Sequence, residues 1–97
     1  MITSKQRAHL RSLANGVPSI CQIGKDGISD NLVKQLDTAL TARELVKSNV
    51  LDNAPLTARE ALDTLSKHLG AEPVQAIGKT FVMYRQSKDE KKRTIKL

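Results

Sequence analysis

Aromatic side chains are almost absent from this chain of 97 residues, which has no tryptophan and only two rings, Phe81 and Tyr84. Proteins that recognise single-stranded RNA by stacking its bases need several exposed rings. The composition therefore disfavours a stacking platform. It still indicates a globular domain, because 39% of the residues are hydrophobic and 27% are charged.

Cysteine is equally scarce. Cys21 is the sole cysteine in the sequence, so no disulfide can form within the chain, and this pattern suits a reducing compartment. Its position in an apolar run favours a small buried side chain over a reactive thiol. The sequence has no apolar run that could span a bilayer or act as a signal peptide. We therefore expect a cytoplasmic protein with no membrane partner.

Patterns that carry catalysis or bind metals are also missing. There is no Walker phosphate loop and no G-x-G-x-x-G, and Cys21, His9 and His68 lack the spacing of metal ligands. A Cys–His pair assembled in space is not excluded by the sequence, but it would require an exposed and activated Cys21. We expect no enzyme activity, no cofactor, no metal and no small-molecule substrate.

Positive charge is in excess, and it lies at the two ends of the chain. The net charge is +6. Residues 1–27 carry +3 and residues 85–97 carry +4, whereas residues 28–84 carry −1. A polyanion is the natural partner of such a distribution, although composition alone does not choose between RNA and DNA.

Periodicity and capping signals predict three helices and four strands. The expected helices run from the Thr3 cap to Asn15, from Ser29 or Asp30 through Leu40, and from the Thr57 cap to Gly70. The expected strands are residues 19–23, 44–51, 74–77 and 80–85. Strands joined through helices favour parallel pairing, and Gly78-Lys79 favours a final antiparallel hairpin. We therefore predict an α/β (α+β) two-layer sandwich with a four-stranded mixed sheet.

One domain is expected over residues 1–86, followed by a basic and mobile tail over residues 87–97. In the first helix, we expect Leu10, Leu13 and Ala14 to form the buried face, and Asn15-Gly16 to end the helix in a left-handed conformation.

The segment Gly24-Lys25-Asp26-Gly27 joins the first strand to the second helix. Two glycines three residues apart allow a sharp turn, and the helix start supplies unpaired N–H groups and a positive dipole end. A phosphate backbone could lie against such a loop, with Lys25 adding charge. The G-x-x-G pattern is common, so an ordinary strand-to-helix turn is the alternative.

Several stretches together resemble the CRM domain (chloroplast RNA splicing and ribosome maturation). They are residues 5–14 (KQRAHLRSLA), 22–27 (QIGKDG), 42–47 (ARELVK) and 74–85 (VQAIGKTFVMYR). A free-standing domain of this length is similar to the bacterial YhbY group. Two residues depart from the usual pattern: Asp26 places an acid in the loop, and Pro73 is expected to shorten the third strand.

The resemblance implies a fold like the C-terminal domain of bacterial translation initiation factor three. It also implies RNA binding without catalysis, in association with precursors of the large ribosomal subunit. The family's loop falls on Gly24, Lys25, Asp26 and Gly27. Its basic helix residues fall on Lys5, Arg7 and Arg11, and we add Lys34, Lys79, Arg85 and Lys88 as further candidates, each with a plain solvated side chain as the alternative.

The leading hypothesis from the sequence is thus a monomeric RNA-binding assembly factor that holds ribosomal RNA through the loop and the basic helix face. One alternative is a KH-like reader of single-stranded RNA, in which the G-x-x-G joins two helices. The apolar, strand-like run before Gly24 argues against it. A basic adaptor that binds other proteins is the alternative from a different class.

Overall fold

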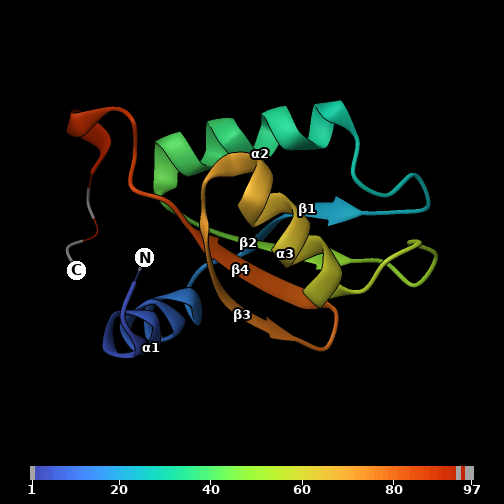
Figure 1. Ribbon diagram of the computed structural model, residues 1–97, viewed down its shortest axis with the longest axis horizontal. Coiled ribbons are helices and arrows are strands. Elements are labelled where there is room, and N and C mark those ends of the chain that lie inside the picture. The colour runs from blue at the N-terminus through green and yellow to red at the C-terminus, as the bar shows by residue number, and fades with distance from the viewer. Residues whose placement is uncertain (1, 94, 96–97) are drawn as a thin grey trace.

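A computed structural model describes residues 2–93 and 95 (Figure 1). The helices are α1 (Ser4–Ala14), α2 (Asp30–Arg43) and α3 (Ala58–Leu69), with a short 3-10 helix η1 (Glu90–Lys92) after them. The strands are β1 (Ser19–Ile23), β2 (Leu45–Val50), β3 (Glu72–Ile77) and β4 (Thr80–Tyr84). The order of the main elements is the predicted one.

Helix starts follow the capping signals in the sequence. The Thr3 and Thr57 hydroxyls each accept the backbone N–H three residues later, at 3.1 Å from Gln6 and 3.2 Å from Glu60. The side chains of those two residues accept the cap N–H in return, so both capping boxes are complete. Gly70 ends α3 with a φ of 64°, the left-handed cap that glycine adopts without steric cost.

The four strands form one mixed sheet in the order β1-β2-β4-β3. β1 and β2 pair in parallel across the α2 connection, whereas β4 pairs antiparallel with both β2 and β3. The last strand of the chain therefore lies between two earlier ones. This arrangement confirms the predicted four-stranded mixed sheet and its closing hairpin.

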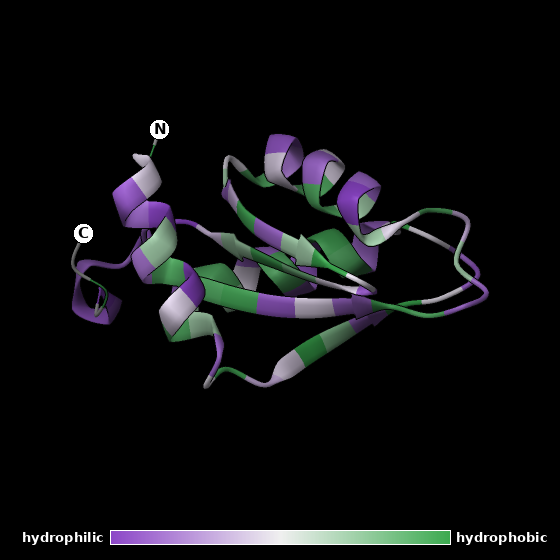
Figure 2. Ribbon diagram, turned by 90° about the horizontal axis from the view of Figure 1, so that it is seen from below, coloured by the Kyte–Doolittle hydropathy of each residue, from purple (hydrophilic) through white to green (hydrophobic). Residues whose placement is uncertain are grey.

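Helices α2 and α3 pack on one face of the sheet and make the main two-layer core. That core includes Ile23, Leu36, Leu62, Phe81 and Met83, each at most 1% exposed. Helix α1 lies on the opposite face (Figures 1 and 2). It forms a second, smaller core, whose buried members are Leu10, Ala14, Leu45, Val74, Val82 and Tyr84. Successive residues of β2 and β4 contribute side chains to the two cores in turn, because successive strand side chains point to opposite faces of the sheet.

Three local expectations differ from the structure. Leu13 is 39% exposed, since α1 buries a stripe only wide enough for Leu10 and Ala14. Asn15 caps α1 in the right-handed region, with a φ of −59°, so no left-handed residue is needed there. β3 begins at Glu72 and includes Pro73, and the pairing with β4 shifts register between Pro73 and Gln75. The edge position accommodates proline, because one side of β3 has no strand partner.

The segment after β4 contacts α2 instead of leaving the domain. Ser87 is 1% exposed and its N–H donates to Glu44 Oε2 at 2.9 Å, while the Ile95 N–H donates to Glu44 Oε1 at 3.1 Å. Arg93 Nε donates to the Ser87 carbonyl at 2.8 Å. Residues 94 and 96–97 of the predicted tail lie outside the described residues. The described part thus has a defined path, and its mobility in solution stays a prediction.

Candidate nucleic-acid interface

The Gly24–Gly27 loop is a tight turn between β1 and α2. The Gly27 N–H donates to the Gly24 carbonyl at 3.0 Å. Gly27 has a φ of +66°, and a Cβ there would lie 3.2 Å from Pro55 Cγ. Gly24 has an ordinary φ, and a Cβ there would lie 3.8 Å from Leu51 Cδ1, a normal contact distance. The turn therefore requires glycine at position 27, whereas position 24 can accept a side chain.

The start of α2 closes one side of this loop. The Ser29 hydroxyl accepts the Leu32 N–H at 3.2 Å and caps the helix, as predicted. An open hollow of about 510 Å³ lies between the loop and the first turns of α2. Its lining is mainly polar and consists of Gln22, Gly24, Lys25, Asp26, Gly27, Ser29, Asn31, Leu32, Gln35 and Asn53. The exposed Lys25 brings positive charge to the rim, and the exposed Asp26 offsets part of it.

The basic residues of α1 lie far from this loop. In both views, the loop is at one end of the long axis, and α1 with the C-terminal segment is at the other (Figures 1 and 2). Lys5 and Arg11 are exposed. Arg7 is partly buried, and its Nε donates to the Pro73 carbonyl at 3.2 Å, which places this flank of α1 beside β3. The structure therefore separates the predicted site residues into two groups.

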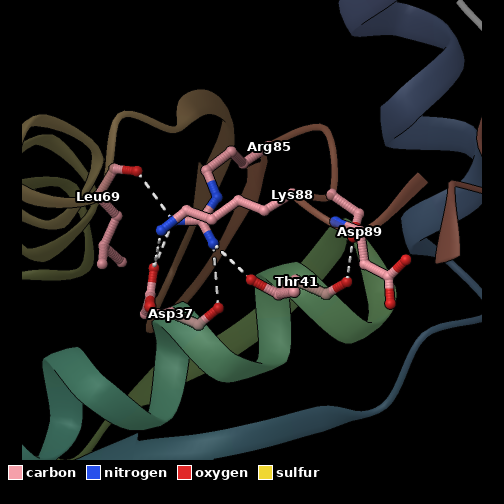
Figure 3. Close-up of polar contacts among 7 residues, drawn as sticks. Asp37, Thr41, Leu69, Arg85, Lys88 and Asp89 are labelled. Carbon is pink, nitrogen blue, oxygen red and sulfur yellow. Dashed lines mark hydrogen bonds and ion pairs between the residues drawn. The ribbon is translucent and has the colours of Figure 1, made fainter. Parts of the chain in front are cut away.

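Arg85 is held inside the protein at the point where β4, α2 and α3 meet (Figure 3). Its side chain is 10% exposed. Nη1 donates to Asp37 Oδ1 at 2.7 Å and to the Leu69 carbonyl at 3.0 Å. Nη2 donates to the Asp37 carbonyl and to Thr41 Oγ1, both at 3.0 Å. The guanidinium is thus engaged by protein groups, which leaves little of it for a phosphate.

The contact with Arg85 changes the pKa of the Asp37 carboxyl. The hydrogen bond from Arg85 is the main cause that lowers the pKa of Asp37. Desolvation opposes it, and the positive charges of Arg85 and Lys88 lower the pKa further. Lys88 Nζ lies 3.5 Å from Asp37 Oδ1, and its side chain is 68% exposed. Lys88 therefore keeps most of its surface open to a ligand.

The two remaining candidates lie nearer the loop end. Lys34 is exposed on α2, in its second turn. Lys79, at the tip of the β3–β4 hairpin, forms an ion pair with Asp52 in the loop after β2, and both side chains are mostly exposed. An exposed pair of this kind contributes little to stability. Lys79 can therefore exchange its partner for a phosphate at low cost.

Sequence reasoning missed the polar side chains on the sheet face that α1 leaves uncovered. Lys47 and Asn49 are half-buried in the central strand β2, where they alternate with the buried Val46, Ser48 and Val50. That period of two is the signal that could have placed them on the second face. The run of three polar residues, Lys47, Ser48 and Asn49, hid the alternation.

Residues 2–93 and 95 contain neither a membrane-spanning helix nor a cluster of metal ligands. None of the helices there has the length and apolar character that crossing a membrane requires. No group of three or more His, Cys, Asp or Glu side chains in that part is arranged to hold a metal ion. Cys21 is buried, as predicted, and burial raises the pKa of its thiol.

Comparison with known proteins gives a consistent match. Residues 2–85 match the family model of the CRS1 / YhbY (CRM) domain. The protein named "Probable RNA-binding protein YqeI" of Bacillus subtilis is 43% identical over 94% of this chain and 95% of its own length. A Haemophilus influenzae protein named "RNA-binding protein" is 27% identical over 93% of this chain and 91% of its own length.

A solved structure shows the same fold. The solution structure of a hypothetical protein from Staphylococcus aureus, described as a candidate RNA binding protein, has a TM-score of 0.79 and 45% sequence identity to this chain. The match covers 99% of this chain and 100% of that one. The predicted fold class and the predicted family are both confirmed.

Proposed function

This chain belongs to the CRS1 / YhbY (CRM) domain family, and we propose that it binds RNA as a ribosome assembly factor. The observation that carries the proposal is the match to relatives of nearly equal length whose names state RNA binding. The excess of positive charge supports it, since electrostatic attraction to phosphates supplies much of the affinity of such proteins.

The Gly24–Gly27 loop is proposed to hold one stretch of the RNA backbone. The hollow beside it offers Ser29 and Asn31 at the start of α2, where backbone N–H groups and the positive end of the helix dipole favour an anion. Lys25 adds a mobile cation. Asp26 works against this attraction, so we expect the loop to position a phosphate more than to supply affinity.

The second proposed contact group is at the α1 end. Lys5, Arg7 and Arg11 present positive charge there. Lys88 adds positive charge beside Asp37 of α2, on the opposite face of the sheet from α1. Lys34 and Lys79 extend the loop end in the same way. Arg85 is left out of the proposed contacts, because its guanidinium already donates to Asp37, Leu69 and Thr41. With two aromatic rings, both buried, recognition follows RNA shape and backbone position.

The proposed partner is ribosomal RNA in precursors of the large ribosomal subunit, bound by a monomer in the cytoplasm without catalysis. A KH-like mode is disfavoured, because the glycine loop here follows a strand, β1, instead of a helix. A basic adaptor for proteins is the remaining alternative, and it differs in its dependence on RNA.

Two measurements test this function. Gradient sedimentation of the tagged protein in bacterial lysate should show co-migration with large-subunit precursors at low and moderate salt, and RNase treatment should release it. In direct binding to purified large-subunit ribosomal RNA, the logarithm of the affinity should fall linearly with the logarithm of the salt concentration. A protein that stays at the top of the gradient and binds no RNA would contradict the proposal, and salt-independent binding to ribosomal proteins alone would favour the adaptor.

A further inference from the structure

In the part of the chain that the structure describes, one end of one sheet face has no helix over it. Helix α1 covers only the end of that face where Leu45 and Tyr84 lie, and it leaves the end nearer the Gly24–Gly27 loop open (Figure 2). Six polar residues point to this uncovered part, which we call the open face. They are Ser19, Gln22, Lys47, Asn49, Gln75 and Thr80, all exposed or half-buried.

Strand pairing sets these side chains beside one another. Asn49 of β2 pairs with Gln22 on one side and with Thr80 of β4 on the other, so the three form one row across the sheet. Ser19 Oγ donates to Asn49 Oδ1 at 2.8 Å, which ties the edge strand to this row. Lys47 pairs with Val82, and Gln75 of β3 pairs with the other side of Val82, so a second row runs parallel to the first.

The open face carries positive charge without an acid to balance it. None of its six residues is acidic. Lys47 is in the central strand, with its aliphatic stem beside the buried Val82. Within residues 2–93 and 95, no ion pair involves Lys47, whereas Lys79 and Lys88 each have an aspartate partner. A half-buried lysine without a counter-charge favours an external anion at this place.

The open face also lies between the two groups of candidate contacts. The loop is at one end of the strands, and α1 crosses the other end (Figures 1 and 2). Arg7 and Arg11 are one turn apart on a shared flank of α1, and the contact of Arg7 with Pro73 places this flank beside the sheet. Lys47, in β2, therefore lies between the loop end and the α1 end of the sheet.

We propose that the open face is an RNA-contacting surface that connects the loop to the basic flank of α1. Lys47 contacts a phosphate, and the amides of Gln22 and Asn49 contact neighbouring phosphate or ribose oxygens. Amide groups both donate and accept hydrogen bonds, so they suit the 2′-hydroxyl, which does the same. An acidic protein would offer carboxylates, which cannot donate to the amide oxygens of Gln22 and Asn49 as a 2′-hydroxyl can. This inference rests on the proposed RNA binding.

The test compares binding of purified large-subunit ribosomal RNA to the full chain and to four variants. Lys47→Gln removes the central charge, and Asn49→Asp adds a negative charge without changing side-chain size. Lys67→Gln is the matched control, because Lys67 is exposed on α3, on the other side of the sheet. Lys25→Gln reports on the loop. Thermal unfolding of each variant shows whether the fold is kept, and Asn49→Asp carries the test if Lys47→Gln is destabilised.

One phosphate contact contributes about 0.7 to 0.9 to the slope of log affinity against log salt. Lys47→Gln should therefore lower the affinity for RNA about fivefold to eightfold at 0.1 M salt. It should also reduce the slope by about 0.7 to 0.9, while Lys67→Gln binds like the parent. Parent-like binding by both Lys47→Gln and Asn49→Asp, with Lys25→Gln weakened, would overturn this inference and leave the proposed function standing. A parent chain that binds no RNA would overturn both.

Discussion

Arg85 Nη1 lies 2.7 Å from Asp37 Oδ1, and this contact joins the end of β4 to the middle of α2. The same guanidinium reaches the Leu69 carbonyl at the end of α3. A residue that sequence reasoning placed on the RNA surface thus connects three elements of the core. Its position explains why the basic C-terminal region begins with a buried cation.

Replacement of Arg85 should reduce stability without changing RNA affinity. In Arg85→Gln, the Leu69 and Asp37 carbonyls and Thr41 lose their donor, and hydrogen bonds from charged groups contribute about 1.5–3 kcal/mol each. Because the contacts share one side chain, we expect a loss of about 2–3 kcal/mol in the free energy of unfolding, measured with urea. Arg59→Gln is the control, because the exposed Arg59–Asp63 pair contributes at most about 0.5 kcal/mol. Equal losses in the two variants would contradict the structural role.

Stability should fall in acid because of Asp37. Its pKa in the folded state is lowered, chiefly by the hydrogen bond from Arg85. The ionised carboxylate therefore favours the folded state above the ordinary pKa of 3.8, and this contribution is lost as pH falls through the lower, folded-state pKa. Asp37→Asn should show a shallower decline of stability below about pH 4. The measurement is urea unfolding at several pH values, and identical profiles would argue against the contribution of Asp37.

The two loop glycines should differ in their tolerance of a side chain. Gly27→Ala forces a left-handed conformation on alanine and brings Cβ to 3.2 Å from Pro55 Cγ, so we expect a loss of about 1–2 kcal/mol. Gly24→Ala should be within about 0.5 kcal/mol of the parent in urea unfolding. Gly24→Asp then separates folding from binding, because it adds negative charge to the loop. It should weaken RNA binding more than Gly24→Ala does, and equal affinities would remove this position from the interface.

The C-terminal segment should loosen when Glu44 loses its charge. Glu44 is 0% exposed, has a φ of 67°, and accepts the N–H groups of Ser87 and Ile95. In Glu44→Gln, one side-chain oxygen becomes an NH₂ group, which cannot accept a hydrogen bond from an N–H. Amide hydrogen exchange at whichever of Ser87 and Ile95 loses its acceptor should therefore speed up about tenfold, since a lost bond of about 1.4 kcal/mol corresponds to that factor. Fast exchange already in the parent would instead favour the predicted mobile tail.

Local signals in the sequence were enough for most of the fold. Thr3 and Thr57 begin helices through complete capping boxes, and Gly70 ends one, because these motifs act within a few residues of the chain. The density of β-branched and aromatic residues predicted a strand over residues 80–85, and β4 spans Thr80–Tyr84. Leu13 was predicted on the buried face of α1 and is exposed. The width of the stripe that α1 buries depends on the shape of the sheet beneath it, and the periodicity of one helix carries no information about that shape.

The candidate site was less predictable than the fold. The loop was located by its glycines, yet the different demands on Gly24 and Gly27 come from Leu51, Pro55 and their loop, which are distant in sequence. Arg85 was predicted at the end of the last strand as a candidate RNA contact. Its acceptors on α2 and α3 are 16 or more positions away, so no local signal in the sequence indicates its burial. Charge in a sequence gives the sign of a surface, whereas burial decides which charges remain on it.

The central position of β4 has a consequence for folding during synthesis. β4 contributes Phe81 and Met83 to the larger core and Val82 and Tyr84 to the smaller one, and it carries β3 at the edge of the sheet. A nascent chain that lacks these residues has neither core closed, and its β2 edge is unpaired. The domain therefore completes its folding only after residue 84 has left the ribosome, because neither core is closed without β4.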